Sequence, residues 1–285
     1  MSDALQHRLA EALFPAAMRA GAEMMRVFNG ERIVDSKADG SPVTAADLIA
    51  EEIVLEALSK IAPGVPVVAE ESASAGIMPK TEDVFFLVDP LDGTREFAAG
   101  RPEFTLNIAL IENRRPVFGL IYAPALSQLL WTTSGTDAFQ AVAAPGTATA
   151  FNALARQRLA TRARPAGGLT IVASRSHGSE ALEAWLHNVE VAERTNTGSS
   201  LKFCLVAEGK ADLYPRFGPT KEWDTAAGHA IAEAAGAIVT GTDGGPFVYG
   251  KVGDDYLNPG FIVWGRPETA AAHAETARRM EALKA

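Results

Sequence analysis

Apolar residues recur at intervals of three and four over residues 4–27, and again over residues 44–61. This spacing gives a helix one apolar face along its length. Pro63 and Gly64 follow the second segment, and both residue types end helices. The N-terminal part of the chain is therefore predicted to form two amphipathic helices.

A series of short apolar runs follows these helices. The runs span residues 65–69, 84–88, 104–111, 117–122 and 128–132. Brief turn segments such as 112–116 join consecutive runs, which is typical of antiparallel strands. We therefore expect an antiparallel sheet that packs one face against the two helices.

The pattern changes between residues 141 and 168, where Ala, Thr, Pro, Gly and Arg replace the periodic apolar positions. We interpret part of this stretch as a surface connection between two halves, residues 1–155 and 156–285. Beyond it, strand-like and helical runs alternate, as they do in α/β folds. The strand-like runs are 169–173 and 189–195, and the helical runs are 179–187, 201–208 and 224–235.

Composition narrows the class of protein. The 285 residues include 26 basic and 35 acidic side chains, which gives a net charge of −9 and argues against nucleic-acid polymers and anionic membranes as partners. Bound cations could still reverse the sign locally. The single cysteine, Cys204, excludes an internal disulfide and is expected to be a buried thiol. Without an apolar run of 18 residues or a signal-peptide pattern, the predicted location is cytoplasmic.

The segment Asp89-Pro-Leu-Asp92-Gly93-Thr94 directly follows the apolar run that ends at Val88. Two aspartates three residues apart in a turn can ligate hard cations, and oxygen ligands of this kind suit Mg²⁺. Their spacing fits neither an EF-hand loop nor the aspartyl nucleophile of a D-x-D-x-T phosphatase. The alternative is an ordinary acidic β-turn.

Other acids must converge on this turn if it is a metal site. Glu70 and Glu71 close the strand-like run at residues 65–69, and Asp224 and Asp47 each stand near the start of a predicted helix. Each has a purely structural alternative, because Asp224 could be a helix N-cap and Asp47 could complement the helix dipole.

Together, four segments resemble the inositol monophosphatase superfamily of Mg²⁺-dependent, lithium-sensitive phosphatases. The segments are Pro-Val-Thr-Ala-Ala-Asp at 42–47, Glu-Glu-Ser at 70–72, Asp-Pro-Leu-Asp-Gly-Thr at 89–94, and Trp-Asp-Thr-Ala-Ala-Gly at 223–228. Within the superfamily, five further segments are most similar to bacterial 3′(2′),5′-bisphosphate nucleotidases. Those segments are residues 95–97, 103–111, 198–209, 213–220 and 258–261.

The resemblance implies a layered α-β-α-β-α sandwich of the inositol monophosphatase and fructose-1,6-bisphosphatase type, with its site between the halves. The first half would carry an antiparallel sheet and the metal-binding turn, and the second would complete the site and bind the nucleotide. Two or three Mg²⁺ ions are implied. Glu70, Asp89 and the Leu91 carbonyl would hold the first, and Asp89, Asp92 and Asp224 would hold the second.

The resemblance also assigns catalytic and substrate-binding roles. Asp47 and Thr94 would position and deprotonate the attacking water, with Glu70 assisting, and the amides of Gly93 and Thr94 would receive the phosphate. The other implied substrate contacts are Glu70, Leu91, Asp92, Asp224, Ser174 and His177 of a Ser-Arg-Ser-His element, and Lys202.

Aromatic and basic residues leave alternatives open near the nucleotide. Tyr214 and Phe217 could wall the base or could pack in a core. Residues 151–179 hold five arginines and no acid, and these could meet phosphate or could be a solvated linker; they are Arg156, Arg158, Arg162, Arg164 and Arg175.

The resemblance implies an enzyme that hydrolyses the 3′-phosphate of adenosine 3′,5′-bisphosphate, and also of 3′-phosphoadenylyl sulfate, as in sulfur assimilation. The alternative substrates are inositol monophosphate, histidinol phosphate or another small alcohol phosphate. A silent metal- or nucleotide-binding module is disfavoured, since all the implied catalytic residues are present. Oligomeric state (monomer or homodimer) and peripheral association with the inner membrane are left open.

Overall fold

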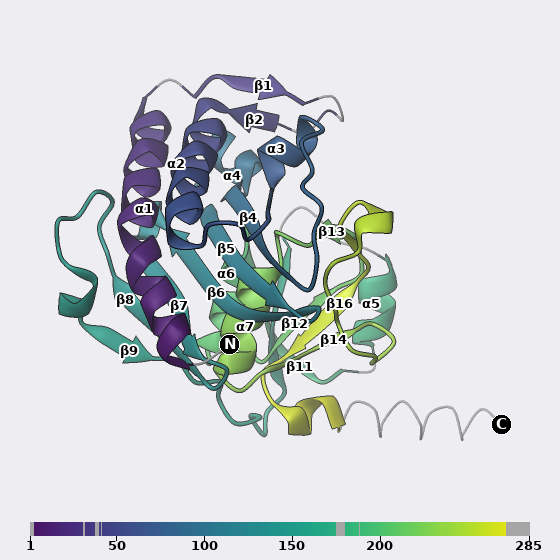
Figure 1. Cartoon of the computed structure of the whole chain (residues 1–285). Helices are drawn as coiled ribbons and strands as arrows, with labels where there is room; N and C mark the ends of the chain where they lie inside the picture. Colours follow the sequence, from purple (N-terminus) through teal and green to yellow (C-terminus); the bar gives the residue numbers. More distant parts are fainter. Residues whose placement is uncertain are drawn as a thin grey trace.

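The computed structural model describes residues 3–30, 32–37, 40, 42–174, 180–187 and 189–271. Their elements form layers that alternate between helices and sheets (Figure 1). The outer helices α1 (Asp3–Asn29) and α2 (Ala45–Ile61) cover one face of a seven-stranded sheet, and α7 (Ala226–Ala234) packs against the other. Helix α6 (Leu201–Ala207) lies beside α7. A five-stranded sheet and α5 (Glu180–Leu186) complete the predicted α-β-α-β-α sandwich.

The seven-stranded sheet confirms the predicted antiparallel arrangement. All of its neighbouring strands are antiparallel except β3 and β4, which run parallel. Two of its strands, β8 and β9, were not predicted. In spatial order the strands are β3 (Val67–Ala69), β4 (Val84–Asp92), β5 (Thr105–Glu112), β6 (Arg115–Ala123), β7 (Gln128–Ser134), β8 (Asp137–Val142) and β9 (Arg156–Arg158).

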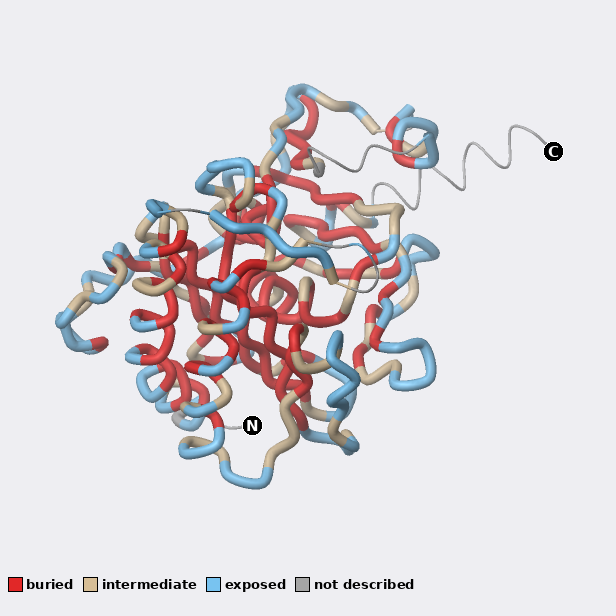
Figure 2. Tube along the Cα trace, turned by 90° about the horizontal axis from the view of Figure 1, so that it is seen from above, coloured by how far each residue is buried: buried red, intermediate tan, exposed pale blue. Residues whose placement is uncertain are grey.

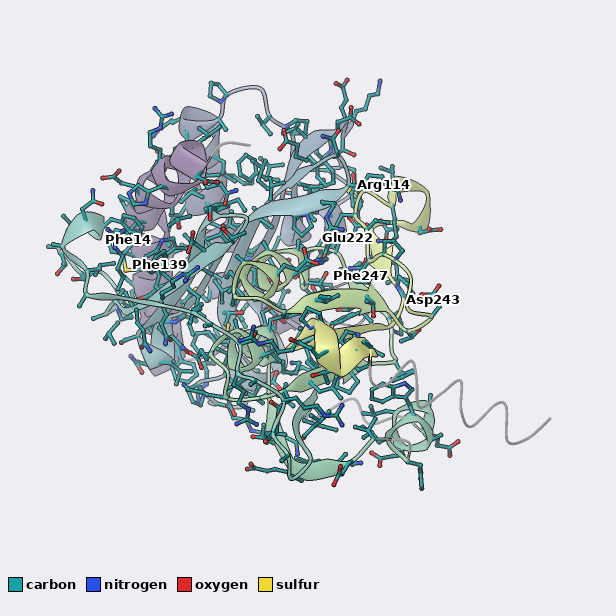
Figure 3. All side chains as sticks on the ribbon, turned by 90° about the horizontal axis from the view of Figure 1, so that it is seen from below. Phe14, Arg114, Phe139, Glu222, Asp243 and Phe247 are labelled. Carbon is teal, nitrogen blue, oxygen red and sulfur yellow. The ribbon has the colours of Figure 1, made fainter. Side chains whose placement is uncertain are left out.

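Both faces of this sheet are buried, which explains its nearly continuous apolar runs. On β4, Phe86 and Val88 belong to the core beneath α1 and α2, whereas Phe85 and Leu87 belong to the core around α6 and α7. Figure 2 shows buried backbone through the centre of the molecule and exposed backbone at its rim. In Figure 3, Phe14 and Phe139 lie on the α1 side and Phe247 on the opposite side.

A glycine sets the distance between α7 and the sheet. A Cβ added at Gly119 of β6 would lie 2.4 Å from the carbonyl oxygen of Ala227. Only a residue without a side chain therefore fits at this contact, and α7 lies close against β6. Cys204 is buried in the same core, as predicted.

The five-stranded sheet mixes parallel and antiparallel pairs. Its spatial order is β11 (Val191–Thr197), β10 (Leu169–Ser174), β12 (Leu213–Arg216), β16 (Phe261–Trp264) and β14 (Ile238–Gly241). Strand β10 is parallel to both of its neighbours, whereas β16 is antiparallel to β12 and β14. Leu182 and Leu186 of α5 are buried against the outer face of this sheet.

Short elements complete the described chain. Two-stranded sheets pair β1 (Val34–Ser36) with β2 (Pro42–Thr44), and β13 (Thr220–Lys221) with β15 (Leu257–Asn258). Helices α3 (Glu70–Ser74) and α4 (Thr94–Ala98) are single turns, and 3₁₀ turns span Pro124–Leu126, Phe151–Ala153 and Val252–Asp254. Across the residues that the structure describes, none of the helices is long and apolar enough to cross a membrane.

Candidate active site

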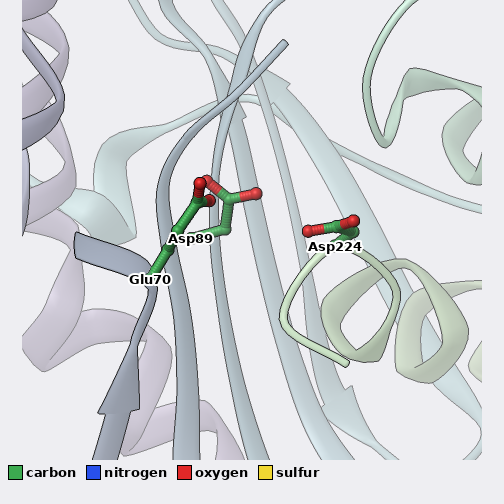
Figure 4. Close-up of side chains that lie close together, drawn as sticks. All are labelled: Glu70, Asp89 and Asp224. Atoms are coloured by element: carbon green, nitrogen blue, oxygen red, sulfur yellow. The ribbon is translucent and has the colours of Figure 1, made fainter. Parts of the chain in front are cut away.

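Three carboxylates from distant parts of the chain converge at one place. Glu70, Asp89 and Asp224 each contribute one oxygen, and these oxygens all lie within 4.8 Å of one another. The parallel pairing of β3 with β4 brings Ala69 opposite Val88, so the next residues of the two strands are neighbours. Figure 4 shows Glu70 and Asp89 side by side, with Asp224 facing them from the loop that leads into α7.

Asp92 lies close to this cluster at a distortion of β4. The strand continues to Asp92, with a register shift relative to β5 between Asp89 and Asp92. The sequence analysis was therefore wrong to place both aspartates in a turn beyond the strand. A strand can include a bulge that re-aims side chains without ending its pairing. Asp92 lines the same cavity as Glu70 and Asp224.

Burial and mutual repulsion disfavour the charged forms of Glu70, Asp89 and Asp224. Burial, with the charges of Glu70 and Asp92 added, raises the pKa of Asp89 well above its ordinary value. Burial and the charges of Asp92 and Glu70 raise the pKa of Asp224 to about 7. Such a cluster of buried oxygens matches the ligand preference of hard divalent cations, whose charge would relieve the repulsion. The residues present therefore fit a metal site.

Lys37 adds a cation that the sequence analysis missed. Its Nζ lies 2.7 Å from Oε1 of Glu70 and 2.7 Å from Oε1 of Glu71. Burial acts against the ammonium form of Lys37, but the two carboxylates outweigh it and raise its pKa. Burial likewise raises the pKa of Glu71 to about 7 despite the hydrogen bond from Lys37. Lys37 lies shortly before residues 42–47, which carry the family resemblance. Its closeness to that segment was the sequence signal that could have identified it as a site residue.

Asp47 and Thr94 form the pair that the sequence analysis expected to meet. Thr44 caps α2, and its backbone N–H and hydroxyl donate to Oδ2 of Asp47 over 2.8 Å and 2.6 Å. Asp47 lies in the first turn of α2, where the structural alternative placed it. Its other oxygen, Oδ1, accepts from the Thr94 hydroxyl at 3.3 Å. Burial raises the pKa of Asp47, whereas the hydrogen bonds from Thr44 act in the opposite direction.

The Asp224 segment is held by different contacts from those expected. Thr225, rather than Asp224, occupies the N-cap of α7. The carboxylate of Asp224 instead accepts from the Thr220 hydroxyl and from the backbone N–H of Lys221. If Asp224 were the N-cap, α7 would begin one residue earlier than it does. The side chain of Asp224 therefore does not cap the helix and belongs to the acidic cluster.

A cavity of about 320 Å³ opens beside the acidic cluster. Gly93 lies at its wall with a φ of +94°, and a Cβ there would approach the carbonyl oxygen of Glu103 to 2.9 Å. Lys202 is buried, donates to the carbonyl of Ser199 over 2.5 Å and lies over the Tyr214 ring. Both halves of the chain contribute acidic and basic side chains to the cavity wall. Its basic lining residues are Arg95, Lys202, Arg216 and Lys221.

The other residues predicted to lie near the nucleotide are Ser174, His177, Tyr214 and Phe217. Ser174 ends β10, and His177 lies outside the described residues, as do Arg175 and Ser176. Tyr214 packs against Phe203 and Phe261 and also lines the cavity, whereas Phe217 packs against Trp185.

The arginine-rich stretch lies away from the cavity. Arg158 pairs with Asp137, Arg162 pairs with Asp212, and Arg156 lies over Phe139. All three side chains are exposed, as the solvated interpretation expected, but Arg156 and Arg158 belong to strand β9 and not to a linker.

Comparisons with known proteins agree with this geometry. A model of the inositol monophosphatase family matches residues 5–282. The 3′(2′),5′-bisphosphate nucleotidase CysQ of Escherichia coli K12 is 44% identical over 250 residues, which cover 87% of this chain and 96% of that protein. The CysQ homologue of Buchnera aphidicola is 36% identical over 89% of this chain and 92% of its own length.

Solved structures agree with these comparisons. CysQ from Bacteroides thetaiotaomicron has a TM-score of 0.74 and 38% identity, covering 91% of this chain and 97% of that one. The extragenic suppressor protein suhB of Bartonella henselae has a TM-score of 0.73 and 26% identity, covering 94% of this chain and 98% of that one. The chain belongs to the inositol monophosphatase family.

Proposed function

We propose that this protein is a Mg²⁺-dependent phosphomonoesterase that releases the 3′-phosphate of adenosine 3′,5′-bisphosphate, with 3′-phosphoadenylyl sulfate as a second substrate. The observation that carries the proposal is the convergence of Glu70, Asp89 and Asp224 beside a cavity lined with basic side chains. The relatives that share 44% of their residues with this chain carry the name of that activity.

The metal ligands are proposed from the donor atoms present. Glu70, Asp89 and the Leu91 carbonyl would hold one Mg²⁺, and Asp89, Asp92 and Asp224 would hold a second. When bound, the metal supplies positive charge that acidifies a water and stabilises the phosphoryl oxygens. No protein nucleophile is needed, because water attacks directly.

Asp47 and Thr94 would prepare that water. The Thr94 hydroxyl donates to Oδ1 of Asp47, which leaves its oxygen free to accept a hydrogen bond from water. As water attacks phosphorus, its proton passes to the Thr94 oxygen while the Thr94 proton passes to Asp47. The bond between phosphorus and ribose O3′ breaks in the same step, and the departing O3′ takes a proton from solvent water. The raised pKa of Asp47 suits this role of general base.

Backbone and basic groups would hold the substrate. The amides of Gly93 and Thr94 are proposed to bind the phosphate that is released, and Lys202 to bind the other phosphate. Lysine binds phosphate as a point charge and rarely lies buried without an anionic partner. Ser174 and His177 are proposed to bind the nucleotide from the second half, residues 156–285.

A substrate panel tests this proposal. Phosphate release is measured with Mg²⁺ for adenosine 3′,5′-bisphosphate, inositol 1-phosphate and histidinol phosphate, with and without lithium. We expect kcat/KM for the nucleotide to exceed that for the other two by at least about 100-fold, because a buried group that binds a second phosphate is left unpaired by a monophosphate. Faster turnover of inositol 1-phosphate would refute the nucleotide assignment and leave the phosphatase assignment intact.

A further inference from the structure

Four buried polar side chains form a continuous hydrogen-bonded chain between β5 and the start of α6. Ser199 Oγ lies 2.5 Å from Thr105 Oγ1, which lies 2.9 Å from Asn107 Oδ1, and Asn107 Nδ2 lies 2.9 Å from Ser200 Oγ. All four residues are at most 9% exposed. Chains of this kind rigidify a site when every group has a partner.

The direction of each hydrogen bond follows from the donors available. Asn107 Oδ1 can only accept, so the single proton of Thr105 is directed to it. Ser199 must then donate to Thr105, and its own oxygen accepts from the backbone N–H of Ser200 at 2.6 Å. Because Asn107 Nδ2 donates to the Ser200 oxygen, the hydroxyl proton of Ser200 is left to donate to a partner other than these four side chains.

That remaining proton faces two acceptors in the acidic site. Ser200 Oγ lies 2.8 Å from Oδ2 of Asp92 and 2.8 Å from the carbonyl oxygen of Asp224. Asp92 belongs to the seven-stranded sheet and Asp224 to the loop before α7. One hydroxyl therefore contacts both proposed ligand segments, and a charged carboxylate is the stronger of its two acceptors.

We propose that Ser200 is a positioning residue for Asp92. Its hydroxyl, oriented by Asn107, donates to Oδ2 of Asp92 and leaves Oδ1 for a cation. This inference rests on the proposed metal-dependent function. It adds a role for Ser200 that is separate from substrate binding, because the hydroxyl acts through Asp92.

Metal titration tests the role without relying on catalysis. EDTA-stripped full-length protein is titrated with Mg²⁺ by calorimetry in the absence of substrate, for the natural protein and for S200A, S200C and S200T. The threonine variant keeps the hydroxyl, and the cysteine variant fills the space with a weak donor. S134A is the matched control, because Ser134 is also buried and donates to an aspartate, Asp137, at 3.1 Å, yet it lies outside the cavity.

We expect S200A and S200C to weaken Mg²⁺ binding about tenfold, as is usual when a group that orients a metal ligand is lost. S200T and S134A should bind as the natural protein does. At saturating Mg²⁺, KM for the nucleotide should stay within about twofold in S200A, which separates positioning from substrate contact.

Two results would overturn the inference. If S200A and S200C bind Mg²⁺ as tightly as S134A, Ser200 does not position Asp92, and the proposed function is unaffected. If the natural protein itself binds no Mg²⁺, the proposed metal dependence fails and the inference fails with it. Should S200A not fold, S200C decides the first outcome.

Discussion

The Thr94 hydroxyl donates to Oδ1 of Asp47 over 3.3 Å, and this contact joins the start of α2 to the start of α4. The same hydroxyl also lies 3.2 Å from the carbonyl oxygen of Leu91. Because Thr44 occupies Oδ2 of Asp47, the carboxylate has one oxygen fixed by its own helix and the other directed at the site. Asp47 therefore completes the cap of its own helix and also meets Thr94, which is the contact that the proposed activation of water requires.

Substitution of this pair should separate chemistry from binding. We expect Asp47→Asn and Thr94→Val each to lower kcat roughly 100- to 10,000-fold, the usual contribution of general base catalysis. Calorimetric Mg²⁺ affinity should change little, because neither side chain is a proposed ligand. Thr44→Ala is the control, since it breaks the helix cap at a cost of about 1 kcal/mol and keeps the pair. A Thr44→Ala protein as inactive as Asp47→Asn would contradict the assignment.

The stability of the metal-free protein should fall as pH rises. Asp224 has an ordinary pKa of 3.8 and a folded-state pKa of about 7. A raised folded pKa contributes stability that is complete below the unfolded value and is lost as pH passes through the folded value. Tm in EDTA should therefore decrease between about pH 4 and pH 8, and Mg²⁺ should diminish that decrease.

The contribution of Asp224 itself is measured by substitution. Asp224→Asn should flatten the dependence of Tm on pH in EDTA, while Asp243→Asn, at an exposed aspartate, should leave it unchanged. Equal slopes for the natural protein and Asp224→Asn would show that Asp224 does not carry the effect.

Lys37 should matter most when metal is absent. Lys37→Met leaves Glu70 and Glu71 without their buried cationic partner, and breaking such a pair costs about 3 kcal/mol or more. Mg²⁺ at Glu70 should offset part of that cost, so denaturant unfolding should show a smaller loss with Mg²⁺ than with EDTA. Lys60→Met removes an exposed pair with Glu56, which solvent screens, and should change stability little in both conditions. An equal loss for Lys37→Met in both conditions would argue against a metal at Glu70.

The contact between Gly119 and α7 should link packing to the site. Gly119→Ala places a methyl group 2.4 Å from the Ala227 carbonyl, so α7 must move, at a cost of about 1–3 kcal/mol. Since only the N-cap residue Thr225 separates Asp224 from α7, the Mg²⁺ concentration for half-maximal activity should also rise. Gly135→Ala is the control, because a Cβ there meets nothing within 4 Å. Loss of stability in Gly119→Ala with unchanged Mg²⁺ dependence would show that α7 does not position Asp224.

The sequence predicted the first sheet better than the second for a physical reason. Strands such as β5 and β6 have eight and nine residues and are apolar on both faces, so their runs are conspicuous. Strands β12, β14 and β16 have four residues each. Four residues are too few to show a hydrophobic period, so these strands are recognised only in the folded structure.

For the site, motif resemblance predicted which carboxylates to test, and the cluster Glu70, Asp89 and Asp224 agrees with it. The resemblance could not predict the contacts of residues to which it assigns no role at the metal site. Ser200 reaches Asp92 across 108 positions, and Lys37 reaches Glu70 across 33. These partners come together only in the folded chain. A hydrogen bond between residues far apart in the sequence produces no periodic pattern from which it could be predicted.

Product analysis tests the central claim most directly. Adenosine 3′,5′-bisphosphate is incubated with the natural protein and with Asp89→Asn, each with Mg²⁺ and with EDTA, and the nucleotides are separated by chromatography. The account predicts 5′-AMP and one equivalent of phosphate from the natural protein with Mg²⁺ alone, and no product with EDTA or from Asp89→Asn. Formation of 3′-AMP, or undiminished 5′-AMP in EDTA or from Asp89→Asn, would contradict it.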